Sequence, residues 1–285
     1  MSTATLSPDS GTGRKAGPPG SPVAYPSADG RTSLRSHLRH VGALTRRNLM
    51  RIKADPESMF DAILMPIVFT LLFVYVFGGA ISGSQQDYKQ MLIPGLLGTT
   101  GMNLAMAVGT GLNSDFQTGV MDRFRTLPIA RSAVLIGKMI AEACRGLLSF
   151  AILIGFALLL GFQLKTGVLG MLEAVGLSLL FGMSLVWVSM LLGLVMRSAQ
   201  AVQGISMLVM MPLQFGSSIF APTSTMPGWL QTFTRYNPLS SLADACRNLI
   251  NGGPVAHSVT LVLIWSVGLT AVTAPLAVAR FRKRT

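Results

Sequence analysis

The chain has 285 residues, of which 50% are hydrophobic and only 12% are charged, and its formal net charge is +12. This composition excludes a soluble globular domain, and the apolar runs, about twice the roughly ten residues of a barrel strand, exclude a membrane β-barrel. The predicted fold class is an all-α polytopic membrane protein. The positive charge fits the positive-inside rule better than nucleic-acid binding, because no soluble basic face is expected.

The N-terminal part of the chain falls into two segments. Residues 1–32 are rich in Ser, Gly, Pro, Ala and Thr, which predicts a disordered cytoplasmic tail that is too polar for a signal peptide. Residues 34–54 place apolar side chains on one helical face and cations on the other, which predicts an interfacial helix. The cations to be considered there are Arg39, Arg46, Arg47 and Arg51. A DNA-binding helix is the alternative, but a span that begins a few residues later holds this helix against the bilayer.

Six apolar runs are long enough to cross a bilayer. They cover residues 59–80, 91–112, 133–160, 168–195, 201–220 and 258–279. We expect Pro66 to kink the first span, with neighbouring helices covering the freed carbonyl. Glycines such as Gly98 let the second span approach a neighbour or bend. In the fifth span Met207 and Met211 either line a pliable surface or simply pack. The candidates for a substrate path, between two copies of the chain and lined by the first, second and fifth spans, are Pro66, Gly98, Met207 and Met211.

The third span carries two charged residues, Glu142 and Arg145, three positions apart. Ionisable residues within a membrane are functional candidates, but this pair is also spaced to form an ion pair on one helix face near the cytoplasmic interface. We favour the structural pair. No catalytic, cofactor or metal site is expected, because His37 and His40 are accompanied by no carboxylate or thiol.

Residues 113–131 interrupt the apolar pattern between the second and third spans and should lie in water. Phe116, Val120, Phe124 and Leu127 share one helical face, and Pro128 ends that short helix. An amphipathic helix across the mouth of a bundle is suited to docking on a soluble partner. The residues to be considered are Asp115, Gly119, Met121, Asp122, Arg123, Phe124, Arg125, Leu127 and Pro128. A solvated loop whose charges only fix orientation is the alternative.

Residues 221–250 interrupt the pattern again, after the fifth span, and carry three prolines and an interfacial tryptophan. These residues are Pro222, Pro227, Trp229 and Pro238. With six spans both termini lie on one side, and placing them in the cytoplasm puts 18 of the 23 lysines and arginines inside.

The string GVMDRFRTLPIARSAVLIGK, residues 119–138, resembles the signature of type-2 ABC exporter permeases, in the branch of the daunorubicin and doxorubicin resistance permeases. The similarity extends from about Ser33 onward. It implies that residues 113–131 form the coupling helix, that residues 34–54 form the elbow helix, and that residues 221–250 form a re-entrant hairpin acting as an outer gate.

The resemblance also implies the partners. Two ATP-binding subunits, which bind ATP and Mg, would dock on a pair of permease chains in the cell membrane, as a homodimer or a heterodimer. The chain itself has no P-loop sequence GxxxxGK[ST]. A secondary transporter and a membrane scaffold without transport are the alternative classes. The short external loops favour an amphiphilic or apolar substrate, such as a drug, an antibiotic or a lipid.

Overall fold

The computed structural model describes residues 42, 45, 46, 48, 50, 64, 66–78, 81, 83–120 and 131–284, with side chains from 135 in the last range. All of the described residues belong to one compact unit, residues 32–285. The expected tail, most of the expected elbow helix and residues 121–130 lie outside the described residues. Within the elbow region, Gly42, Thr45, Arg46, Asn48 and Met50 are helical.

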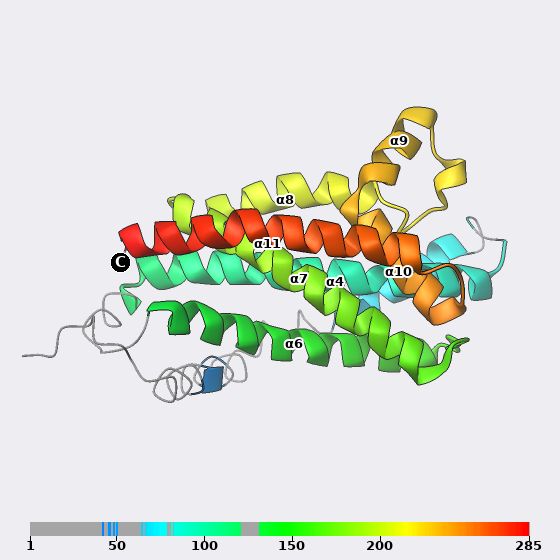
Figure 1. Ribbon diagram of the computed structural model, residues 1–285. Helices are drawn as coiled ribbons and strands as arrows, with labels where there is room; N and C mark the ends of the chain where they lie inside the picture. The colour runs from blue at the N-terminus through cyan, green and yellow to red at the C-terminus, as the bar shows by residue number, and fades with distance from the viewer. Residues whose placement is uncertain are drawn as a thin grey trace, which may run out of the picture. The chain divides into compact units, whose positions relative to one another are not determined.

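All regular structure in the described ranges is helical (Figure 1). The longer helices are α4 (Gln85–Gln117), α6 (Arg131–Leu159), α7 (Gly167–Val195), α8 (Ala199–Phe215) and α11 (Ala256–Arg284). Two shorter helices, α9 (Gly228–Tyr236) and α10 (Pro238–Asn251), lie between α8 and α11, with the 3₁₀ turn η2 (Thr223–Thr225) before them. A helical segment, Pro66–Phe77, precedes α4 and ends in the π-helical turn η1 (Phe73–Phe77).

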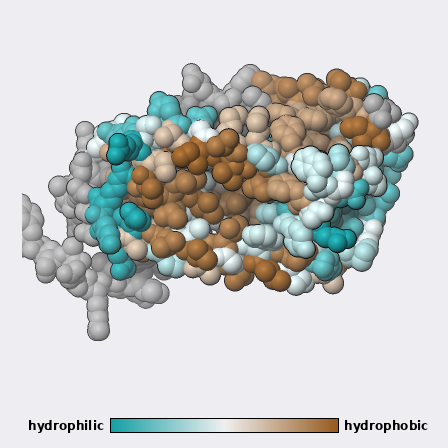
Figure 2. All heavy atoms as spheres, turned by 90° about the horizontal axis from the view of Figure 1, so that it is seen from above, coloured by the Kyte–Doolittle hydropathy of each residue, from teal (hydrophilic) through white to brown (hydrophobic). Residues whose placement is uncertain are grey.

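Among the described residues, four helices are long and apolar enough to cross a membrane: α4, α6 from Leu135, α7 and α11. Their outer surfaces carry large apolar side chains, such as Leu159 (85% exposed) on α6 and Val267 (66% exposed) on α11. Figure 2 shows an apolar band between two more hydrophilic ends. Such a surface is unfavourable in water and suits a bilayer, so the chain is a multi-pass membrane protein.

Of the other two expected spans, the fifth is shorter than predicted. Helix α8 has 17 residues and ends at Phe215, so residues 216–220 of the expected fifth span are turns. Gly216 is the C-cap of α8. In a longer helix its carbonyl oxygen would accept a backbone amide of the next turn, but here it accepts a hydrogen bond from Thr234 Oγ1 at 3.0 Å. Of the expected first span, the described part is helical from Pro66 to Gly78.

Helix α4 is the centre of the fold, and 78% of its most apolar stretch is buried. It is longer than the expected second span at both ends: residues 85–90, predicted as a connection, and residues 113–117, predicted to lie in water, are helical. Asn113 and Asp115 are buried. These two residues therefore lack the expected exposure to water, whereas Gln117, at the end of the same helix, is exposed.

Glycines bring α4 and α7 into backbone contact. An added Cβ at Gly101 would lie 3.1 Å from the carbonyl oxygen of Ser178, and one at Gly109 would lie 2.5 Å from that of Ser189. A Cβ at Gly193 would meet the carbonyl oxygen of Gly109. The glycines of the second span therefore serve close packing, one of the two roles that the sequence left open.

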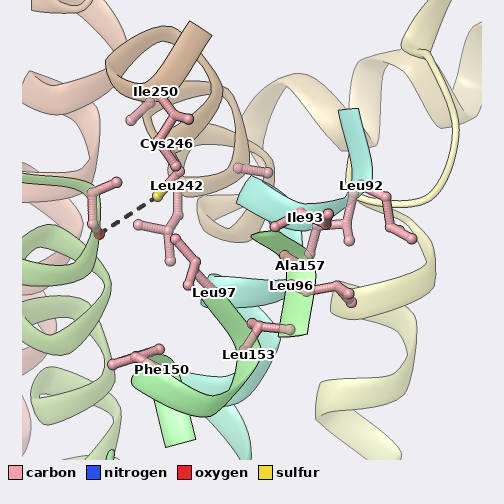
Figure 3. Packing of buried hydrophobic residues seen from close by; sticks show 14 of the residues in the cluster. Leu92, Ile93, Leu96, Leu97, Phe150, Leu153, Ala157, Leu242, Cys246 and Ile250 are labelled. Atoms are coloured by element: carbon pink, nitrogen blue, oxygen red, sulfur yellow. Dashed lines mark hydrogen bonds between the residues drawn. The ribbon is translucent and has the colours of Figure 1, made fainter. Parts of the chain in front are cut away.

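The main core lies between α4, α6, α7 and α10. Figure 3 shows its members from α4 (Leu92, Ile93, Leu96, Leu97), α6 (Phe150, Leu153, Ala157) and α10 (Leu242, Cys246, Ile250). The Cys246 sulfur lies 3.3 Å from Ser178 Oγ on α7. The side chain of Cys246 is fully buried, because α10 packs its apolar face on α4 and α7. Burial raises the pKa of the Cys246 thiol to about 11.

Candidate functional site

Two polar groupings stand out in this apolar bundle, one at each end. We call the end where α4, α7 and α11 finish the basic end, because α11 finishes there with Arg280, Arg282, Lys283 and Arg284. We call the opposite end, where α9 and α10 lie, the hairpin end (Figure 1).

At the hairpin end, Arg247 of α10 joins three segments of the chain. Its Nε donates to the carbonyl oxygen of Met91 on α4 at 2.8 Å, and its Nη1 pairs with Asp244 Oδ1 at 2.8 Å. Its Nη2 donates to the carbonyl oxygens of Ser218 and Ile219. The sequence placed Arg247 on the outer side, in the returning helix of the expected hairpin, yet its side chain is only 16% exposed. We call Arg247, Asp244, Ser218, Ile219 and Met91 the Arg247 network.

Near the Arg247 network, a proline in α4 leaves one carbonyl group without its helical hydrogen bond, and α10 supplies a replacement donor. Pro94 has no amide hydrogen, so the carbonyl oxygen of Gln90, four residues earlier, loses its helical donor. Asn251 Nδ2 donates to that oxygen at 3.0 Å, and Arg247 binds the next carbonyl along. Tyr88 adds a hydrogen bond from its hydroxyl to the carbonyl oxygen of Phe220 at 3.0 Å. These bonds attach α10 and residues 218–220 to the first turns of α4.

The Asn237-Pro238 step fixes the other side of the hairpin. Asn237 Oδ1 accepts the Leu239 amide and so caps α10, in which Pro238 occupies the first turn. Its Nδ2 donates to the carbonyl oxygens of Leu213 at 2.7 Å and Gly216 at 3.2 Å, at the end of α8. The other candidates for the outer gate lie nearby: Pro222 precedes η2, Pro227 is the N-cap of α9, and Trp229 is 73% exposed on α9.

At the basic end, the last turn of α4 joins α6 and α7. Asp115 Oδ2 accepts from Lys138 Nζ of α6 at 2.6 Å, with both side chains largely buried. Asn113 Nδ2 donates to the carbonyl oxygens of Gly193 at 2.8 Å and Met196 at 2.9 Å, where α7 ends. Of the candidate coupling residues, Asp115 thus belongs to α4. Gly119 follows α4 with a φ of +70°, a backbone conformation that favours glycine, and the other candidates, residues 121–128, lie outside the described residues.

The candidate path residues occupy different surroundings. Met207 and Met211 are about half exposed on α8, whose buried residues are Val202 and Ser206. Pro66 is partly buried. Gly98 faces α10 instead of an open path: an added Cβ would lie 3.1 Å from a methyl carbon of Leu242.

Glu142 and Arg145 form the expected ion pair, with Oε2 and Nε 2.8 Å apart and each side chain 11% exposed. Glu142 lines a small cleft between α4, α6 and α7 together with Gly101 and Gly182. Both glycines lie near the middle of their helices, so this pair is deeper in the bundle than the interface position that the sequence suggested.

Comparison with known proteins gives these groupings a context. Residues 39–251 match the family model described as ABC-2 type transporter. The chain belongs to the ABC-2 type transporter family. The match begins in the expected elbow region and ends at the last residue of α10, so it contains residues 113–131, helices α9 and α10, and the Arg247 network.

Three relatives of this ABC-2 chain show the breadth of the similarity. It is 40% identical over 253 residues to the daunorubicin resistance ABC transporter permease protein DrrB1 of Streptomyces coeruleorubidus, covering 89% of this chain and 88% of the relative. It is 26% identical to the probable doxorubicin resistance permease DrrC of Mycobacterium tuberculosis (85% and 88% covered). It is 25% identical to the putative transport permease ycf38 of Cyanophora paradoxa (74% of each).

The sequence identified the family from residues 119–138, but it missed the Arg247 network. A signal was available: a helical arginine three residues after an aspartate, within a segment bounded by prolines, is suited to an i, i+3 ion pair. That pattern alone does not reveal that both groups lie against α4.

Proposed function

We propose that this chain is the membrane subunit of an ATP-driven exporter that works with a separate ATP-binding subunit. The observation that carries the proposal is the match to the ABC-2 family over residues 39–251, with 40% identity to a daunorubicin resistance permease. A sequence without a P-loop needs a partner to bind ATP. Two ATP-binding subunits and two permease chains make up the proposed complex.

The ATP-binding subunit docks on residues 113–131 and on the elbow helix, residues 34–54. Residues 113–117 are the end of the most buried helix of the bundle, so movement of the docking segment acts directly on α4. The exposed Arg46 lies on the helical part of residues 42–50, where a cation suits a headgroup or an acidic partner.

In this proposal the basic end faces the cytoplasm and the hairpin end faces outward, with the chain in the cell membrane. The positive-inside rule supports this orientation, because Lys and Arg are concentrated in the termini and in residues 113–138. The segments around Pro66–Phe77 and α8 complete six crossings. Helices α9 and α10 form a re-entrant hairpin that closes the outer side.

The substrate path lies between two permease chains and is lined by the first span and α8. Both present large exposed apolar side chains: Tyr75 and Val76 on the first span, and Met207, Leu208 and Met211 on α8. Gly98 enters the path only if α10 moves away from α4. Exposed methionines adapt to compounds of different shape, which supports an amphiphilic drug, antibiotic or lipid as substrate.

Charge changes in the coupling segment should separate transport from folding. Asp122→Ala and Arg123→Glu are expected to leave the chain inserted at its normal level but to lower export and recovery of the ATP-binding subunit about 5-fold or more, because the docking helix loses its polar contacts. Co-purification from detergent extracts and export of a fluorescent anthracycline from cells measure the two effects. Arg282→Glu, which also reverses a charge at the basic end, is the control. Unchanged export and recovery in both coupling variants would place the docking surface elsewhere.

A further inference from the structure

The end of α7 is held by side chains from two other helices. Helix α7 finishes at Val195, and its last carbonyl groups have no partner within the helix. The side-chain amide of Asn113 on α4 donates to two carbonyl oxygens there, those of Gly193 and Met196. Arg284, the last residue of α11, donates from Nη1 to the carbonyl oxygen of Leu194 at 2.7 Å.

The same arginine also contacts α4. The guanidinium carbon of Arg284 lies 4.9 Å from the centre of the Phe116 ring, within cation–π range. Phe281, one turn earlier on α11, meets Phe116 edge to face, with the ring centres 5.9 Å apart. Gln117 extends the contact, since its Nε2 donates to the carbonyl oxygen of Arg197 at 2.9 Å. We call Asn113, Phe116, Gln117, Phe281 and Arg284 the basic-end clasp.

The clasp lies directly beside the start of the proposed coupling segment. Its α4 members are the last turn before Thr118, where the coupling segment leaves the helix. The Gly109–Gly193 contact lies one turn deeper and brings the two backbones together, which lets short amide side chains reach the α7 carbonyls. Because backbone contact and polar caps hold α4 and α7 together here, we expect the two helices to move as one body at this point.

We propose that Arg284 is a positioning residue for energy coupling: through the basic-end clasp it makes α4, α7 and α11 respond together when the coupling segment moves. This rests on the proposed function. The C-terminal basic run would otherwise serve only to fix orientation, and any cation in it would do. The proposal instead requires an arginine at 284, because one planar group must bind the Leu194 carbonyl and cover the Phe116 ring.

The test uses the full chain with its ATP-binding subunit in proteoliposomes. Arg284→Gln is expected to lower transport per ATP hydrolysed about 5-fold or more while ATP hydrolysis and co-purification persist. Lys283→Gln removes the same charge from the adjacent residue, which is exposed like Arg284 but is not part of the clasp, and should behave as wild type. Arg284→Lys keeps the charge but not the planar group, so its defect should remain. Equal transport ratios in Arg284→Gln and Lys283→Gln would overturn the proposal.

Two further measurements separate this proposal from a general loss of structure and from failure of the proposed function. Gln117→Ala, at an exposed position, should lower the same ratio in the same direction without lowering the protein level. Spin labels at Thr118 and Arg197 should give one distance distribution with and without ATP in wild type, and a broader one in Arg284→Gln. An unchanged distribution in that variant contradicts the clasp, whereas a wild-type chain with no ATP-dependent transport contradicts the proposed function.

Discussion

Gly109→Ala is expected to lower the thermal unfolding midpoint of the purified chain by roughly 2–10 °C and to reduce the amount inserted in the membrane. The new Cβ would lie 2.5 Å from the carbonyl oxygen of Ser189 and 3.0 Å from its side chain. These atoms belong to the backbone and first side-chain carbon of α7, so no flexible group can move aside. The two helices must separate, which costs about 1–3 kcal/mol in an already packed core.

Gly176→Ala on α7 is the matched control. An added Cβ there meets no atom within 4 Å, and alanine is intrinsically better than glycine in a helix by about 1 kcal/mol. This variant should therefore keep or slightly raise the unfolding midpoint. If both variants had the same midpoint as wild type, the close contact of α4 with α7 would be wrong.

Arg247→Met is expected to destabilise the hairpin end and to abolish most export. Methionine fills part of the volume but donates no hydrogen bond, so the carbonyl groups of Ser218 and Ile219 lose their donor. A buried carbonyl without a partner costs about 1–3 kcal/mol. The carbonyl oxygen of Met91 also loses its bond from Arg247, so α10 then holds the first turns of α4 only through the bond from Asn251 to the carbonyl oxygen of Gln90. Arg247→Lys should recover part of the stability, since an ammonium group reaches fewer of these acceptors.

Arg235→Met is the control, because Arg235 belongs to the same hairpin but is exposed on α9. Thermal unfolding in detergent and proteolysis of residues 216–251 measure the effect. We expect the Arg247 variant to be cut faster at this hairpin and the Arg235 variant to be cut as wild type. Equal protection in both would show that the Arg247 network does not hold the hairpin.

Local patterns predicted much of the fold. The lengths of the apolar runs anticipated α4, α6, α7 and α11, since each run had to cover a bilayer by itself. The resemblance in residues 119–138 led to the family that residues 39–251 match. These signals act over neighbouring residues, so one sequence is enough to read them.

Polar contacts between distant residues could not be read in the same way. Arg247 is separated from Met91 by 156 positions, and Arg284 from Leu194 by 90. A charge outside an apolar run is assigned to water when its partners are unknown, which is why Asp115 was expected in water. Likewise, the early end of α8 depends on Thr234 and Asn237, which follow it in the chain.

The central claim, that a separate ATP-binding subunit drives export through this chain, is tested most directly with inside-out membrane vesicles. Vesicles containing this chain, the ATP-binding subunit, or both are given ATP and a fluorescent amphiphilic dye, with and without a protonophore. The account predicts dye uptake only when both subunits and hydrolysable ATP are present, and uptake that persists with the protonophore. Uptake by this chain alone that the protonophore abolishes would contradict the account in favour of a secondary transporter, and no uptake under any condition would contradict it in favour of a scaffold.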